Sequence, residues 1–498
     1  MTKLNKKLIF YIIGMLLVFN GGAMIISSFV SVLFDDGVLK EITFGAIFLI
    51  IMGTLIMTFS KNNIRQINKR DGYVIVTIGW LTMVFSGMLP YYLTGSINSF
   101  SNLFFETMSG YTTTGSTILN DIEILPKSII FWRSMTHWLG GMGIIVLAIA
   151  ILPLLGIGGM QLFSAEAPGI SSDKIHPRIS DTAKRLWIIY FGLTFVETIL
   201  LKIAGMSFFD AINNSMSNIA SGGFSSRNES IGYWNDIPLI QYIIILFMFL
   251  AGTNFVLIYF GLTGKIKKII QDTEFKWYLS LISSFAIIVT VTLYFSVDLS
   301  ATDVNHPQVY GKFESSFRHA LFQVVAIITT TGFVTGDFIS WGPFLTMFFF
   351  GIMFLGGSSG STSGGVKILR HLILIKNGFL EFKRSLHPNG IFPLRHNNSV
   401  VEKPIIIHVL AFFILYLILF IVGAGVLSLL GLDFVSAIGA AASSIGNVGP
   451  ALGALGPISN FDSLPELGKY WCSFLMLIGR LELFTVLILF TPFFWRDR

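Results

Sequence analysis

The chain has 498 residues, of which 53% are hydrophobic and only 12% are charged, and its mean hydropathy is +0.75. This composition excludes an ordinary soluble domain of that length and indicates a polytopic membrane protein. The net charge of +6 at pH 7 does not favour nucleic acid as a partner, because the basic residues are spread over short segments between apolar stretches.

Apolar stretches long enough to cross ~30 Å of hydrocarbon as helices recur along the whole chain. The first follows three lysines, as in a signal peptide, but its 26 residues are too many for a signal's apolar core and no Ala-x-Ala site ends it. We therefore interpret it as a retained helix. The ten predicted spans, the eighth with a broken continuation, cover residues 8–33, 42–59, 73–93, 129–155, 186–204, 238–262, 277–297, 343–354, 405–430 and 470–494.

The basic residues are distributed unevenly between the two sides that these spans define. If the N-terminus is cytoplasmic, the inner segments contain 24 of the 33 Lys and Arg residues, whereas the outer connections are acidic or neutral. Cytoplasmic loops of membrane proteins show this bias. We therefore expect both termini to be cytoplasmic.

A short polar turn that contains glycine occurs four times along the chain. Its matching glycines are separated by 108, 109 and 117 residues, which indicates a fourfold internal repeat. The four copies are Thr112-Thr113-Thr114-Gly115-Ser116, Ser221-Gly222-Gly223-Phe224-Ser225, Thr329-Thr330-Thr331-Gly332-Phe333 and Gly446-Asn447-Val448-Gly449-Pro450.

An apolar run too short to cross a membrane precedes each turn, at residues 102–111, 210–220, 316–328 and 434–444. Such runs are typical of re-entrant half-helices that stop inside the membrane. Glycine allows the turn that follows to direct its carbonyls toward a common centre. Four such turns around one axis would form a ring of oxygens able to replace the hydration shell of an alkali cation.

A run of glycines and serines interrupts what should be the second helix of the third repeat. Glycine has little helical preference and serine competes for backbone hydrogen bonds, so this segment should break the helix. A phosphate-binding loop is disfavoured, because Lys367 comes one place too late and no Ser or Thr follows it. The run is Gly356-Gly357-Ser358-Ser359-Gly360-Ser361-Thr362-Ser363-Gly364-Gly365.

Arg480 lies roughly ten residues inside the last predicted span. A cation at that depth is costly and should face the bundle interior or water, with a partner. Glu482 is two residues away and does not face it on a helix, so we expect the partner on another element. A structural ion pair with another helix stays open at this point.

Other polar residues within the spans are interpreted as structural. We expect Glu197 and Lys202 to be structural, Asp210 to cap the second half-helix, and His137 and Cys472 to be packing residues. No spacing indicates a metal site, a nucleophile triad or paired catalytic carboxylates, so we predict that the chain is not an enzyme.

Together these strings resemble the Trk/Ktr/HKT superfamily of potassium transport proteins, and specifically its TrkH type. The resemblance covers nearly the whole chain, including two additional helices before the first repeat. It is carried by Tyr111-Thr112-Thr113-Thr114-Gly115, Trp138-Leu139-Gly140-Gly141-Met142-Gly143, Ile219-Ala220-Ser221-Gly222-Gly223-Phe224-Ser225 and Asn447-Val448-Gly449-Pro450.

The resemblance implies an all-α polytopic membrane protein, with four helix, pore-loop, helix repeats around a central pore. The implied units are two extra N-terminal helices at 1–70, pore repeat 1 at 71–180, repeat 2 at 181–275, repeat 3 at 276–403 with a gating loop at 356–365, and repeat 4 at 404–498. A serine in place of Gly115 is associated with sodium transport in this superfamily, so the four glycines favour potassium.

The resemblance also implies the residues of the pore. Those of the potassium-binding filter are Thr113, Thr114, Gly115, Ser221, Gly222, Gly223, Thr330, Thr331, Gly332, Asn447, Val448 and Gly449. Those of the gate are Gly356, Gly357, Ser358, Ser359, Gly360, Gly364, Gly365 and Arg480.

Potassium would be the substrate, with no cofactor in this chain, in a homodimer of the inner cell membrane. A cytosolic nucleotide-binding regulatory subunit of the TrkA kind would dock on the inner face. Lys376, Lys383, Arg384 and Arg395 are candidates for that surface, although the bias of basic residues to the inner side explains them equally well.

Three alternatives have different strengths. A sodium-permeable member of the same superfamily stays open, as does an ion-coupled secondary carrier with broken helices at the midplane. Four short repeats weigh against the carrier, which commonly has two large ones. A membrane-embedded enzyme is disfavoured, because no cluster of His, Asp or Glu lies at one depth.

Overall fold

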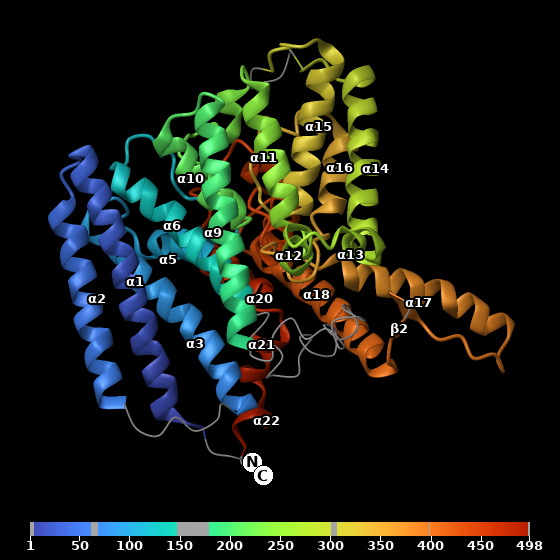
Figure 1. Ribbon diagram of the computed structural model, residues 1–498, viewed down its shortest axis with the longest axis horizontal. Helices are drawn as coiled ribbons and strands as arrows, with labels where there is room; N and C mark the ends of the chain where they lie inside the picture. The colour runs from blue at the N-terminus through green and yellow to red at the C-terminus, as the bar shows by residue number, and fades with distance from the viewer. Residues whose placement is uncertain (1–3, 61–67, 147–178, 300–305, 398, 497–498) are drawn as a thin grey trace.

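The computed structural model describes residues 4–60, 68–146, 179–299, 306–397 and 399–496. In these ranges the chain is a bundle of helices, and its one sheet is a two-stranded antiparallel hairpin of β1 (Arg395–His396) and β2 (Ser399–Val400). The first and last described residues lie at the same end of the bundle, opposite the turn between α1 (Lys6–Phe34) and α2 (Leu39–Ser60) and the C-terminal end of α14 (Thr273–Ser296) (Figure 1).

The helices are grouped here by the predicted repeat in which most of each one lies, and this division stays a prediction. The extra pair is α1 (Lys6–Phe34) and α2 (Leu39–Ser60). Repeat 1 contains α3 (Lys69–Gly87), α4 (Leu89–Leu93), α5 (Phe100–Tyr111) and α6 (Lys127–Val146), and repeat 2 contains α9 (Ile179–Ile203), α10 (Phe208–Ile219), η2 (Ser230–Trp234), α11 (Pro238–Ala251), α12 (Phe255–Leu262) and α13 (Ile266–Gln271).

Repeat 3 contains α14 (Thr273–Ser296), α15 (Lys312–Ile328), α16 (Pro343–Ile352) and α17 (Ile368–Leu386). Repeat 4 contains α18 (Lys403–Leu429), α19 (Phe434–Gly446), η4 (Gly453–Leu455), α20 (Glu466–Arg480), α21 (Phe484–Leu487), η5 (Ile488–Phe490) and α22 (Pro492–Trp495).

Within the described residues, six helices are long and apolar enough to cross a membrane: α1, α2, α3 with α4, α9, α14 and α18. They expose large apolar side chains such as Phe29, Ile47 and Ile287, as expected for surfaces that face lipid. The predicted fold class, an all-helical polytopic membrane protein, is confirmed. The predicted fourth span is helical as α6 to Val146, and its continuation at 147–155 lies outside the described residues.

Two predicted spans differ from the expected single helices. The segment 238–262 forms α11 and α12, bent by 108°, and the segment 470–494 forms α20 and the helices after it, bent by 109°. At the first break, Asn254 caps α12 by accepting a hydrogen bond from the backbone N–H of Val256 (2.8 Å). At the second, Glu482 and Leu483 have positive φ values of 62° and 47°. Hydropathy is high on both sides of each break, so the sequence pattern did not reveal the bends.

The four predicted half-helices are present as α5, α10, α15 and α19. They have 12, 12, 17 and 13 residues. Each packs beside a helix of its own repeat. Three also pack on the helix that follows the loop of the preceding repeat, where repeat 4 is counted as preceding repeat 1: α5 on α20, α10 on α6 and α15 on α11. This arrangement places the C-terminal ends of all four half-helices around the centre of the bundle.

Candidate functional site

Each half-helix ends with the same backbone motif. In loop 1, the N–H of Thr113 donates to the carbonyl of Gly110 (3.0 Å) and the N–H of Thr114 to that of Ser109 (2.9 Å). These are the bonds of a Schellman motif, and they require left-handed backbone two residues before the matching glycine. Non-glycine residues rarely adopt that backbone, so four equivalent cases mark a constrained turn. The four residues are Thr113 (φ 51°), Ser221 (54°), Thr330 (54°) and Asn447 (52°).

The four matching glycines close a ring. Each has positive φ, from 73° at Gly332 to 104° at Gly449. A Cβ atom added to any of them would collide with the carbonyl oxygen of the residue that precedes the next matching glycine. Because the fourth loop meets the first in the same way, the loops surround one axis in chain order. The contacts join Gly115 to Gly222, Gly223 to Thr331, Gly332 to Val448, and Gly449 to Thr114.

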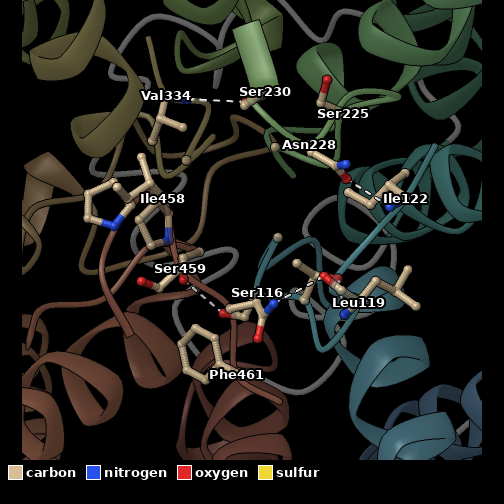
Figure 2. A pocket seen from close by; sticks show the side chains of 18 of the residues that line it. Ser116, Leu119, Ile122, Ser225, Asn228, Ser230, Val334, Ile458, Ser459 and Phe461 are labelled. Carbon is tan, nitrogen blue, oxygen red and sulfur yellow. Dashed lines mark hydrogen bonds between the residues drawn. The ribbon is translucent and has the colours of Figure 1, made fainter. Parts of the chain in front are cut away.

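A cavity of about 150 Å³ lies against this ring and is lined by all four matching glycines. Figure 2 shows its walls: residues that follow the first, second and third glycines, and Ile458, Ser459 and Phe461 from the connection after the fourth. The hydroxyl of Ser116 donates to the carbonyl of Gly449 (2.8 Å), which ties the first loop to the fourth. The cavity therefore reaches the ring from one side, where the connections that were predicted to lie outside the membrane are found.

On the other side of the ring, the Gly/Ser-rich segment contacts three of the four loops. Thr362 bonds through its hydroxyl to that of Ser221 (2.9 Å), and the N–H of Gly364 donates to the hydroxyl of Thr330 (2.6 Å). Gly364 also lies so close to Asn447 that a Cβ on the glycine would be 2.8 Å from the Asn447 Cβ. The segment thus touches the left-handed residues of loops 2, 3 and 4.

The rest of the Gly/Ser-rich segment bonds to the break between α11 and α12 and to a buried carboxylate on α14. The N–H of Ser358 donates to the carbonyl of Gly252 (2.8 Å), and the N–H of Phe255 donates to the carbonyl of Gly360 (3.2 Å), both at the break between α11 and α12. The N–H of Ser359 donates to the buried carboxylate of Glu274 (2.7 Å). Within the segment, Gly357 bonds to Ser363, while Gly356 bonds to Val366 just after it and Gly365 packs on Gly356.

Arg480 is buried beside the same segment, with 2% of its surface exposed. Its Nη1 donates to the carbonyl of Thr362 (2.9 Å), and its Nε and Nη2 have no hydrogen-bond partner in the described part of the chain. Glu482 pairs with Arg370 of α17 instead. The partner of Arg480 is therefore on another element, as the sequence predicted, but it is a carbonyl rather than a carboxylate.

Comparisons with known proteins identify the family of the chain. The family model for TrkH, described as a cation transport protein, matches residues 39–497. The chain belongs to the TrkH family. It is 38% identical over 489 residues to the Trk system potassium uptake protein TrkH of Escherichia coli (strain K12), which covers 98% of both chains.

Two further relatives agree over nearly the whole length. The Trk system potassium uptake protein TrkH of Halomonas elongata is 36% identical, over 99% of this chain and 100% of the relative. The crystal structure of the potassium transporter TrkH from Vibrio parahaemolyticus has a TM-score of 0.88 at 34% identity, over 98% of this chain and 99% of that one. The predicted resemblance is confirmed, and the family is a transporter family rather than an enzyme family.

Behind the first two loops of this TrkH-family chain lies a buried ion pair that the sequence analysis missed. Arg133 of α6 donates through Nε to Glu106 of α5 (2.7 Å) and through Nη1 to the carbonyl of Ser225 (3.0 Å). Glu106 also accepts from the hydroxyl of Thr117 and the N–H of Ile118, both at 3.0 Å. The pair therefore joins loop 1 to loop 2. The sequence did contain a signal for this pair, because each of the two apolar segments carries one charged residue and a charge at that depth needs a partner.

The ion pair continues into a stack of rings. The Arg133 guanidinium lies 3.5 Å from the centre of the Phe224 ring, and His137 stacks on the same ring with centroids 3.9 Å apart. His137 also bonds through Nδ1 to the hydroxyl of Ser217 (2.8 Å). His137 is thus a packing residue, as predicted, and it packs directly behind loop 2.

Replacing Arg133 by Met should destabilise the protein strongly. The change leaves Glu106 as a buried charge without its cation, which costs about 3–5 kcal/mol. Thermal unfolding of the purified protein in detergent measures the loss. As a control, Arg227 pairs with Glu123 and Asp210 at a more exposed site, so Arg227→Gln should cost only ~0–1 kcal/mol. Equal losses in both variants would contradict the assignment of Arg133 as the main cross-link.

Other predicted positions divide into agreements and one correction. Glu197 is buried and accepts a hydrogen bond from Asn218, and Cys472 is buried and free, whereas Lys202 is exposed. Asp210 does not cap α10: the cap is Ser207, whose hydroxyl accepts from the Asp210 N–H (3.0 Å). The Asp210 carboxylate is instead neutralised by Arg227 (3.1 Å).

In the part of the chain that the structure describes, no group of three or more His, Cys, Asp or Glu side chains could hold a metal ion. The four candidate docking residues lie on α17 and β1. There, Lys376 donates to the carbonyl of Arg395 (3.2 Å) and Arg384 pairs with Glu381.

Proposed function

We propose that the chain is a potassium uptake protein that conducts K⁺ through a pore along the axis of the four loops. The observation that carries this proposal is the closed ring in which each matching glycine meets a carbonyl oxygen of the next loop. Carbonyl oxygens arranged around one axis replace the hydration shell of an alkali cation. The names of the relatives, Trk system potassium uptake protein and potassium transporter, agree with this substrate.

In this proposal the twelve filter residues named above line the pore at the four loops. The Schellman bonds use the N–H groups of Thr113 and Thr114 and their equivalents inside the half-helices. Their carbonyls are then available to an ion. The C-terminal ends of four half-helices, which carry partial negative charge, further favour a cation at the ring.

The Gly/Ser-rich segment, with Arg480, is proposed to close the pore below the ring. Its contacts with three loops and the buried guanidinium beside Thr362 support this role. A positive charge beneath a cation site raises the energy of an ion that passes it. Opening then requires the segment to leave the loops.

Reconstitution in liposomes tests the proposal directly. We expect the purified protein to move K⁺ and Rb⁺ down an imposed gradient faster than Na⁺. Equal movement of Na⁺ would favour the sodium-permeable alternative. Flux only in exchange for a second ion would favour the ion-coupled carrier, whose broken helices this chain also has in α11 and α12.

Replacing Thr362 by Val should raise the basal K⁺ flux. The hydroxyl bonds to the Ser221 hydroxyl and to the carbonyls of Ile219 (2.9 Å) and Ala251 (3.2 Å), and valine has no such donor. Losing these bonds removes about 1 kcal/mol or more from the closed arrangement, a severalfold change in flux. The flux assay measures it, with Thr292→Val as control, because Thr292 is half-buried on α14 and, among the described residues, its hydroxyl bonds to Ile288 of the same helix. A lower flux in Thr362→Val would contradict the closing role.

We further propose that the protein is a homodimer of the inner membrane, with both termini cytoplasmic and regulated by a cytosolic nucleotide-binding subunit of the TrkA kind. The common end of the two termini and the basic residues on that side support this orientation (Figure 1). The docking surface would include Lys376, Lys383, Arg384 and Arg395.

A further inference from the structure

The extra helix α1 makes a hydrogen bond to the residue at the end of the first half-helix. Asn20, near the middle of α1, is completely buried. Its side-chain oxygen accepts from the hydroxyl of Tyr111 (2.6 Å), the last residue of α5. Its Nδ2 donates to the hydroxyl of Ser86 (2.6 Å) and the carbonyl of Met83 (3.4 Å) on α3. The amide therefore links α1, α3 and the start of loop 1.

Tyr111 is the position at which repeat 1 departs from the other three. Counting four residues back from each matching glycine gives Tyr111 in repeat 1 and isoleucine in each of the others, at Ile219, Ile328 and Ile445. All four side chains are buried. In the described part of the chain, repeat 1 is the one preceded by an additional pair of helices, and it is also the one with a hydroxyl at this position.

The Tyr111 ring is held closely from other sides as well. A Cβ added to Gly87 of α3 would collide with the ring, and one added to Gly140 of α6 would collide with the Tyr111 carbonyl. Trp132 donates to the carbonyl of Gly87 (3.0 Å), which fixes that surface of α3. A small movement of the Tyr111 side chain therefore cannot be absorbed locally and moves the start of loop 1.

The α1 and α2 hairpin is attached to repeat 1 at two further heights. At one end, the N–H of Asn5 donates to Asp71 of α3 (2.9 Å). At the other end, Asp36 accepts from the N–H and the hydroxyl of Ser128 in α6 (2.8 and 2.6 Å). Partial burial acts to raise the pKa of Asp36, but the hydrogen bonds from Ser128 and Ser31 lower it below its ordinary value. The hairpin is thus bonded to repeat 1 at three heights.

We propose that Asn20 is a positioning residue for ion selection: through Tyr111, the extra N-terminal hairpin sets the position of the first filter loop. This inference rests on the proposed function, because it assigns the hairpin a role in the selectivity of that pore. Asn20 acts through Tyr111 and touches no ion. The hairpin serves one loop of the four, and this fits the asymmetry of the ring.

The test measures the ratio of K⁺ to Na⁺ flux in liposomes for Tyr111→Phe, Asn20→Leu and the double variant. Each change removes the same hydrogen bond, worth about fivefold in an equilibrium, so we expect a ratio about fivefold lower in all three. Asn20→Leu also removes the bonds from Asn20 to Ser86 and Met83. The double variant should be no worse than Asn20→Leu, because Tyr111→Phe removes only the bond that Asn20→Leu has already removed. Where Asn20→Leu alone does not fold, Tyr111→Phe and the double variant decide.

Two matched controls separate positioning from general damage. Tyr91→Phe removes an equally buried hydroxyl, and Ser27→Ala removes one from α1; neither hydroxyl has a partner in the described part of the chain. Both variants should keep the wild-type ratio. An unchanged ratio in Tyr111→Phe, additive losses in the double variant, or an equal loss in Tyr91→Phe would overturn the inference. A wild-type protein that does not discriminate K⁺ from Na⁺ would overturn the proposed function with it.

Discussion

Replacing Gly115 by Ser is expected to abolish most of the discrimination between K⁺ and Na⁺. Gly115 has φ of 89°, and a Cβ there would collide with the carbonyl oxygen of Gly222. The serine must therefore displace either its own loop or the neighbouring carbonyl. A backbone forced into this region costs on the order of 1–3 kcal/mol, so the flux ratio should fall about tenfold or more.

The ratio of K⁺ to Na⁺ flux in liposomes measures this effect, and Gly431→Ser is the matched control. Gly431 also has positive φ, 100°, but a Cβ there would meet nothing within 4 Å. The control therefore shares the backbone strain and lacks the collision with a carbonyl. The filter assignment would be wrong if Gly115→Ser kept the wild-type ratio or if Gly431→Ser lost it equally.

The same geometry predicts that serine has effects of different size at the four glycines. At Gly449 the added Cβ would lie 2.7 Å from the carbonyl oxygen of Thr114, whereas the other three collisions are closer. The neighbouring carbonyl has less distance to move at Gly449, so serine there should lower the ratio of K⁺ to Na⁺ flux less than serine at Gly115 does. The fourth loop also differs in chemistry, because Asn447 replaces the threonine or serine of the other left-handed positions.

The sequence predicted the elements that repeat and the Gly/Ser-rich interruption, and it missed contacts between residues that are far apart in the chain. The four turns were found because their glycines recur at a regular interval, and the half-helices were found because they are too short to cross a membrane. Nothing in that pattern reveals the pairing of Glu106 with Arg133, which are 27 residues apart on different helices. Their partnership depends on packing, which only the three-dimensional structure contains.

Tyr111 and Asp210 illustrate two different reasons for this limit. Tyr111 belonged to a recognised string and was therefore interpreted only as part of the motif, although its contact with Asn20 spans 91 positions in the chain. Asp210 was assigned as a cap because acidic residues favour helix starts. The true cap, Ser207, lies three residues earlier, directly before Phe208 and Phe209, which form the start of the helix.

Replacing Arg480 by Gln is expected to raise K⁺ flux in the absence of any regulatory subunit by about tenfold. A like charge beside the path repels a passing cation by a few kcal/mol at an effective dielectric of ~20, enough to slow ion passage about tenfold or more. Glutamine removes the charge and keeps an amide that can donate to the carbonyl of Thr362, so the segment can stay in place. Flux of K⁺ into liposomes that contain only this chain measures the change.

The control for Arg480→Gln is Arg384→Gln, which removes a cation from α17, where Arg384 pairs with the exposed Glu381. This control should keep the wild-type flux, because a charge at an exposed site is screened by water and salt. A rise in both variants would mean that total charge rather than the buried guanidinium limits conduction. A fall in Arg480→Gln, with its thermal unfolding unchanged, would mean that Arg480 holds the pathway open, and the proposed gate would then have to lie elsewhere. Among the described residues, Nε and Nη2 of the buried Arg480 have no hydrogen-bond partner. This favours the expected rise in flux, because a purely structural arginine would have its donors satisfied.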